Sequence, residues 1–185
     1  MDDKYSEATL REQYEDYKNS YVKREQLKKN GVPIRHQNPP EDITENISKF
    51  IIRNYDNDPT CMWCKGVNKK GDLYSDKYDT IEIKSFTSNG PSQFGPKKKF
   101  SILYFLDLRK WLENNIVLWR VNLQDDSNEF KNVKMNKTQT HSEQCEEGRR
   151  PHISWDKLYP QIKDFCVKIY DGSFEDIFIH LDSSV

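Results

Sequence analysis

The sequence has few cysteines, no long hydrophobic run and no excess of either charge. Four cysteines among 185 residues are few, and without a secretory signal we expect thiols or metal ligands more than disulfides. No run approaches the length of a membrane span, and the start, MDDKYSEATL, lacks the apolar segment of a signal peptide. We therefore expect a soluble, cytoplasmic protein.

The charges are balanced overall but unevenly distributed. The chain has 29 basic and 30 acidic residues and a net charge of -1, so total charge gives no indication of a nucleic-acid partner. Basic residues nevertheless cluster at Lys23, Arg24, Lys28, Lys29 and Arg35, at Lys69 and Lys70, at Lys97, Lys98 and Lys99, and at Arg149 and Arg150. This distribution allows a basic face on a neutral protein.

The sequence contains enough apolar material for a folded core. Four tryptophans, ten tyrosines and nine phenylalanines argue against disorder. A chain of this length fits one compact domain. We expect a single domain over residues 1–185, with an N-terminal helical arm at 1–35 and the core at 41–175.

Hydrophobic periodicity predicts several helices and several strands, the mixture that an α/β (α+β) fold contains. The expected helices cover residues 5–30, 41–55 and 155–172, and the expected strands cover 79–86, with a partner at 71–74, and 101–108 and 115–123. Residues 87–99 and 124–151 are polar or rich in glycine and proline, which indicates loops.

Three charged residues in GDLYSDKYDTIEIK, residues 71–84, suit a metal-dependent reaction. Glu82 and Lys84 are two positions apart on the expected strand, so both lie on the face opposite the isoleucines. If the preceding residues pair with this strand as a hairpin, the carboxylates of Asp72 and Glu82 converge. Such oxygen ligands suit Mg²⁺, which polarises phosphoryl oxygens and lowers the pKa of bound water. The segment predicts a phosphodiester-hydrolysing site.

The same residues have simpler explanations. Charged residues that alternate with isoleucines are typical of a solvated strand face, and an aspartate after glycine is typical of a turn. Spacing alone leaves these alternatives open.

Further motifs extend the pattern into a family resemblance. Asp72, the unit Glu82-Ile83-Lys84 and the following SFTSNGPSQFGP resemble the PD-(D/E)XK signature of small type II restriction endonucleases. Some of these enzymes also have a segment similar to GRRPHISW at residues 148–155. The resemblance covers residues 41–175. Gly71 stands where the family name has proline, a position that provides no metal ligand.

The resemblance implies both a fold and an activity. It implies a central mixed β-sheet flanked by helices, and Mg²⁺-dependent hydrolysis of double-stranded DNA at a short palindromic site that leaves 5′-phosphate ends. Asp72 and Glu82 would be metal ligands, and Lys84 the catalytic lysine. Many members add a helix glutamate as a ligand, here Glu45 in preference to Glu41. The implied partners are a second copy of the chain, as a homodimer, and a DNA methyltransferase that protects the host without forming a stable complex.

Two segments carry side chains that can contact DNA bases and phosphates. Arg, Lys, Asn, Gln and Ser supply such contacts, and glycines allow close approach of the backbone. The candidate DNA-binding residues are Ser88, Asn89, Ser92, Gln93, Lys97, Lys98, Arg149, Arg150 and His152. Taken alone, both segments also fit ordinary basic surface turns.

The cysteines allow a separate hypothesis. Cys61 and Cys64, with His141 and Cys145, have spacings compatible with a structural Zn²⁺ site, although the two pairs are far apart in sequence. The alternative is reduced thiols. With Zn²⁺ bound, the chain could be a non-catalytic nucleic-acid-binding module. A second alternative to the restriction endonuclease is a structure-specific DNA repair nuclease of the same fold.

Overall fold

The centre of the protein is a six-stranded mixed sheet. The computed structural model describes residues 5–35, 38–67, 69, 71–95 and 99–179. The sheet has the order β1-β2-β3-β5-β6-β8, formed by β1 (Met62–Trp63), β2 (Leu73–Ser75), β3 (Asp79–Phe86), β5 (Ile102–Asp107), β6 (Ile116–Val121) and β8 (Cys166–Gly172). Strands β3 and β5 are parallel, and the other neighbours are antiparallel. The expected mixed sheet with helices around it is confirmed.

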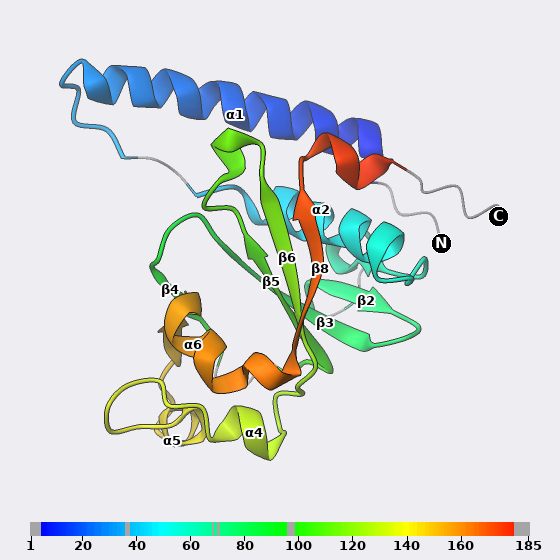
Figure 1. Cartoon of the computed structure of the whole chain (residues 1–185), viewed down its shortest axis with the longest axis vertical. Helices are drawn as coiled ribbons and strands as arrows, with labels where there is room; N and C mark the ends of the chain where they lie inside the picture. Colours follow the sequence, from blue (N-terminus) through cyan, green and yellow to red (C-terminus); the bar gives the residue numbers. More distant parts are fainter. Residues whose placement is uncertain (1–4, 36–37, 68, 70, 96–98, 180–185) are drawn as a thin grey trace.

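Helices of very different lengths surround this sheet (Figure 1). They are α1 (Glu7–Lys29), α2 (Glu41–Tyr55), α3 (Cys64–Val67), α4 (Asn128–Lys131), α5 (His141–Glu146) and α6 (Trp155–Ile162), with 3-10 turns η1 (Trp111–Glu113), η2 (Lys163–Phe165) and η3 (Glu175–Phe178). The predicted helices at 5–30 and 41–55 are confirmed. Helix α1 starts at Ser6, whose Oγ accepts a hydrogen bond from the Thr9 amide. Within the described ranges, no helix is long and apolar enough to cross a membrane.

The two faces of the sheet pack against different sets of helices. Ile81 and Ile83 of β3 belong to one core cluster, together with Ile47 of α2 and Tyr14 of α1. A second cluster covers the opposite face. It contains Leu103 and Phe105 of β5, together with Phe130 of α4 and Trp155 and Leu158 of α6. In Figure 1, α1 crosses one end of the sheet, whereas α4, α5 and α6 gather at the other. The alternation along β3 therefore directs Glu82 and Lys84 to the α4–α6 side.

Part of the segment 87–99, expected to be a loop, forms a second, two-stranded sheet with residues that follow the expected loop 124–151. Strand β4 (Pro91–Gln93) pairs antiparallel with β7 (His152–Ser154), with Gln93 opposite His152. The pairing continues from the Phe94 amide to the carbonyl of Pro151, at 2.8 Å. Because the side chains of Phe94 and Ile153 are buried in the second core cluster, apolar burial gives these short strands a fixed register.

The predicted helix at 155–172 is half wrong. Helix α6 ends at Ile162, and the chain continues through η2 into β8, which pairs antiparallel with β6 at the sheet edge. Pro160 lies inside α6. Because proline has no amide hydrogen, one backbone hydrogen bond of the helix is lost near its end, which disfavours a longer helix. The following Val167, Ile169 and Tyr170 are residue types that favour strands. Cys166, expected on the helix, is a half-buried residue of β8.

Candidate active site

Asp72 immediately precedes β2 and lies opposite Glu82 of β3. The antiparallel register pairs Leu73 with Ile81, so Asp72, one residue earlier, lies opposite Glu82. Its Oδ2 accepts a hydrogen bond from the Ile83 amide at 2.9 Å. Strand β2 pairs with β3 only as far as Ile81. The Asp72 carboxylate therefore binds the Ile83 amide at the edge of β3 that β2 does not cover. The expected hairpin is confirmed, and it holds the Asp72 side chain at a fixed place on β3.

Glu82 and Lys84 form an ion pair on one face of β3. The Lys84 Nζ lies 2.5 Å from Glu82 Oε1. Glu82 is only 1% exposed, and the Lys84 side chain is 16% exposed. The Lys84 Nζ also lies 5.5 Å from the centre of the Phe94 ring. The explanation as a solvated strand face is therefore wrong, because neither charge is freely hydrated.

Glu45 approaches the same place from α2. It is 4% exposed, and its Oε2 accepts a hydrogen bond from the Trp63 indole at 2.6 Å. Burial raises the pKa of Glu45 to about 7; the Trp63 bond opposes this shift, and the negative charge of Asp72 adds to it. Glu41, the other helix candidate, is exposed and lies 3.3 Å from Lys65.

Three of these groups line one cleft, whereas Glu82 lines a different hollow with Phe94 and His141. Glu45, Asp72 and Lys84 line a hollow of about 330 Å³ together with Gln93 of β4. Among the described residues, no group of three or more His, Cys, Asp or Glu side chains is arranged to hold a metal ion. The donor chemistry nevertheless fits Mg²⁺, which is held by one or two carboxylates, waters and substrate phosphate oxygens. Asp72 and Glu82 are the two carboxylates that would hold it.

The candidate DNA-binding residues of the first segment lie beside this cleft. Ser92, which is buried, and Gln93, which is exposed, line it from β4. Ser88, in the loop between β3 and β4, lines an adjoining hollow of about 370 Å³ that shares Ser92. Lys97 and Lys98 lie outside the described residues. The part of the loop that is described is thus adjacent to Asp72 and Lys84.

The second segment joins the first through the β4–β7 pairing. His152 is exposed and faces Gln93 across the two strands. Arg150 is exposed as well, whereas the Nε of Arg149 pairs with a carboxylate oxygen of Glu147 at 2.9 Å. Two segments 60 residues apart therefore form one surface.

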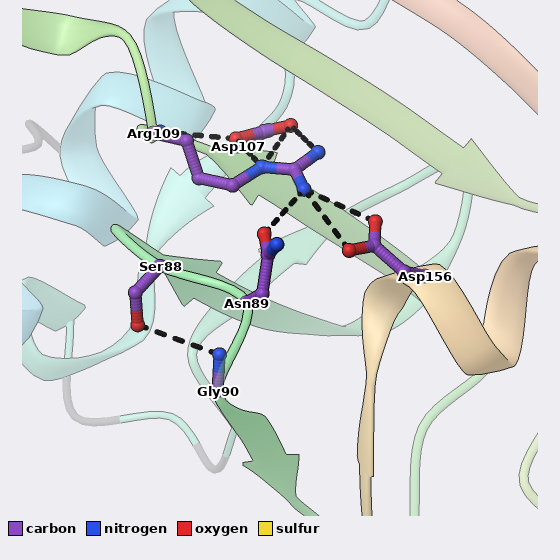
Figure 2. A network of polar contacts seen from close by, with 6 residues as sticks. All are labelled: Ser88, Asn89, Gly90, Asp107, Arg109 and Asp156. Atoms are coloured by element: carbon purple, nitrogen blue, oxygen red, sulfur yellow. Dashed lines mark hydrogen bonds and ion pairs between the residues drawn. The ribbon is translucent and has the colours of Figure 1, made fainter.

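Sequence reasoning missed Arg109, which lies just after β5. Figure 2 shows its guanidinium between Asp107, Asp156 and Asn89, one of the candidate DNA-binding residues. The Arg109 Nη1 donates to Asn89 Oδ1 at 2.8 Å. In the sequence, Arg109 is one of several charged residues in DLRKWLE. The local feature that could have indicated its ion pair is Asp107, two positions before it.

The zinc ligands proposed from sequence do not come together. Cys61 and Cys64 are buried near β1, whereas His141 and Cys145 lie on α5, with Cys145 Sγ 3.8 Å from His141 Nε2. Among the described residues no cluster of four such ligands exists. Burial lowers the pKa of His141 to about 4, and its ring packs against Phe130. His141 is thus a core residue of the α4–α5 region.

Comparisons with known proteins place the chain in a family. The family model described as Bsp6I restriction endonuclease matches residues 3–160, so the chain belongs to that family. It is similar to the type II restriction enzyme Bsp6I of Bacillus sp. (strain RFL6), with 33% identity over 97 residues that cover 51% of this chain and 54% of that enzyme. The match thus spans about half the length of that relative. No solved structure matches.

Proposed function

We propose that the protein is a type II restriction endonuclease that hydrolyses double-stranded DNA at a short palindromic site with Mg²⁺ and leaves 5′-phosphate ends. The observation that carries this proposal is the meeting of Asp72, Glu82 and Lys84 at the open edge of β3. Membership of the Bsp6I restriction endonuclease family supports the same activity. Two carboxylates and a lysine supplied by one hairpin suit phosphodiester hydrolysis.

Each of these residues has a distinct role in the proposed reaction. Asp72 and Glu82 would hold the metal, which polarises the phosphoryl oxygen and lowers the pKa of a water molecule. Lys84 can donate a hydrogen bond to the attacking water or to the phosphate oxygen that gains negative charge. The Ile83 amide keeps Asp72 in place. Glu45, close to Asp72 on the cleft wall, would complete the site as an outer acidic group or third ligand.

The residues around the cleft suit duplex DNA. Side chains that can contact base edges are Ser88, Ser92 and Gln93, which line the hollows next to the proposed catalytic strand, and Asn89, the residue after Ser88. Arg149, Arg150 and His152 extend the surface through β7, and Lys97 and Lys98 would add phosphate contacts. This grouping favours a site-specific nuclease over a repair nuclease with little sequence preference.

A palindromic site calls for a symmetric dimer, since each copy of the active site cuts one strand. Exposed apolar side chains gather at the end of α1: Val22 is 51% exposed, Leu112 of η1 is 47% exposed, and both line one groove. Helix α1 is acidic over residues 7–16 and basic over 23–29. Two copies aligned antiparallel would place opposite charges together. We therefore expect a homodimer through α1. As the proposed activity implies, a separate methyltransferase would protect the host DNA.

Digestion of plasmid or phage DNA tests the proposal. With Mg²⁺, the wild-type chain should give discrete fragments, and sequencing their ends should show one palindromic site and 5′-phosphates. Glu82→Ala should abolish the fragments, whereas Asp76→Asn, in the turn after β2, should keep them. No cleavage of any unmethylated DNA would rule out the proposed activity. Cleavage of branched DNA alone would favour the repair nuclease.

A further inference from the structure

Arg109 connects three parts of the chain at the edge of the proposed DNA surface. Its Nε and Nη2 donate to the Asp107 carboxylate at 3.0 and 2.6 Å, and its Nη1 donates to Asp156 Oδ1 of α6 at 3.0 Å. The guanidinium also lies 5.1 Å from the centre of the Phe86 ring. Figure 2 shows the contacts from the end of β5 and the start of α6, and Phe86 adds one from the end of β3. Arg109 is therefore held on several sides.

The fourth contact of Arg109 determines how Asn89 is presented. The Nη1 donates to Asn89 Oδ1 at 2.8 Å. A guanidinium only donates hydrogen bonds, so the amide must turn its oxygen, and not its nitrogen, toward Arg109. Within the described part of the chain, the Asn89 Nδ2 donates no hydrogen bond. Asn89 is an exposed residue, and it thus offers two N–H donors outward.

Asn89 lies where such donors can meet DNA. Its neighbours Ser88 and Gly90 both line the hollow that adjoins the proposed catalytic cleft. The Gly90 amide lies 3.4 Å from Ser88 Oγ (Figure 2). Hydrogen bonds thus join Ser88 to Gly90 within the loop and Asn89 to Arg109 outside it.

We propose that Arg109 is a positioning residue that fixes Asn89 as a donor-only group, which contacts an acceptor on a DNA base edge. This inference rests on the proposed endonuclease function. An asparagine that recognises adenine uses both its amide groups, accepting from N6 and donating to N7. With Oδ1 turned toward Arg109, the amide oxygen does not face the DNA and that two-bond contact is not available. The two outward N–H donors match guanine, which presents the O6 and N7 acceptors in the major groove, better than adenine, whose N6 group is itself a donor.

The test measures cleavage against base identity at every position of the site. Once end sequencing has identified the site, kcat/KM is measured for duplexes with each base pair changed in turn. Asn89→Asp keeps an acceptor for Arg109 and removes both donors. We expect it to lower the preference for guanine at one position by roughly 10-fold to 100-fold, with the other positions unchanged.

Arg109→Gln removes the fixed guanidinium and so releases the amide of Asn89. We expect it to relax discrimination between guanine and adenine at the same position that Asn89→Asp affects. The double variant Asn89→Asp with Arg109→Gln should lose no more discrimination than Asn89→Asp alone, because both act through one contact. Lys110→Ala, the neighbouring basic residue, is the matched control and should keep the wild-type profile. Circular dichroism melting confirms that each variant is folded.

The possible outcomes separate the inference from the function. If the wild type cleaves a specific site but Asn89→Asp lowers kcat/KM equally for every duplex, Asn89 contacts phosphate and the inference is wrong. Unchanged profiles in both variants would show a purely structural network and would also overturn it. A wild type that cuts no DNA would remove the proposed function, and the inference with it.

Discussion

At the scale of single residues, Asp72 differs from Asp76 and Asp79 in the group that its carboxylate binds. Its carboxylate accepts the Ile83 amide beside Glu82. Asp76 lies in the turn, with its backbone amide donating to Thr60, and Asp79 has a left-handed φ of 58°, which asparagine tolerates as well. Three aspartates within eight residues therefore have different positions relative to the proposed metal.

This difference gives a prediction for substitutions of the three aspartates. Asp72→Asn should lower the single-turnover cleavage rate by roughly 100-fold or more, because the amide loses the charge that binds the metal. The amide oxygen can still accept the Ile83 amide, so unfolding in urea should change little. Asp76→Asn and Asp79→Asn should keep cleavage within a few-fold of wild type. Equal losses in all three variants would contradict the assignment.

At the scale of elements, α5 is held by a buried histidine. His141 lies between aromatic rings that include Phe94 and Phe130, and Thr140 and Glu143 form a capping box at the helix start. Desolvation lowers the pKa of His141 from 6.5 to about 4. The folded state therefore binds this proton less readily than the unfolded chain does.

Folding stability should accordingly depend on pH through His141. Its contribution is fully present above the unfolded pKa of 6.5 and is lost as the pH falls toward 4, and the loss of stability at pH 4 amounts to about 3 kcal/mol. His141→Phe removes the titration while keeping an aromatic ring. Urea unfolding at pH 7 and pH 4.5 should show a smaller loss for His141→Phe than for wild type. If wild type and His141→Phe lost the same free energy of unfolding between pH 7 and pH 4.5, the pKa of His141 would not be lowered in the folded state, which would contradict the prediction.

At the scale of the whole molecule, the proposed homodimer depends on the end of α1. Sedimentation equilibrium should give a mass of about twice the 22.1 kDa of one chain. Val22→Asp with Leu112→Asp should shift the protein toward monomer, because charge replaces exposed apolar surface in the groove. Val167→Asp, at an exposed position on β8, is the control and should remain dimeric. A wild-type monomer, also with DNA bound, would contradict the proposal.

The predictable parts of this protein are those in which neighbours in sequence are also neighbours in space. Helices α1 and α2 follow from periodicity and their end signals, and the β2–β3 hairpin follows from strand alternation around a short turn. Because one hairpin supplies Asp72, Glu82 and Lys84, the meeting of these side chains is already determined by local register. The same strand pattern, however, did not distinguish a solvated face from a buried ion pair.

The remaining features depend on contacts between distant segments. Residues 166–172 become β8 because the edge of β6 is open to them, although the preceding residues are helical. Likewise β4 and β7 are strands only in each other's presence, and Arg109 reaches Asn89 only after β3, β5 and α6 have packed. The sequence alone thus determined α1, α2, the buried strands β5 and β6, and the charged hairpin. The tertiary structure decided how deeply Glu82 is buried, which segments form the proposed DNA surface and which way the Asn89 amide faces, since burial and long-range hydrogen bonds arise only when separate elements pack.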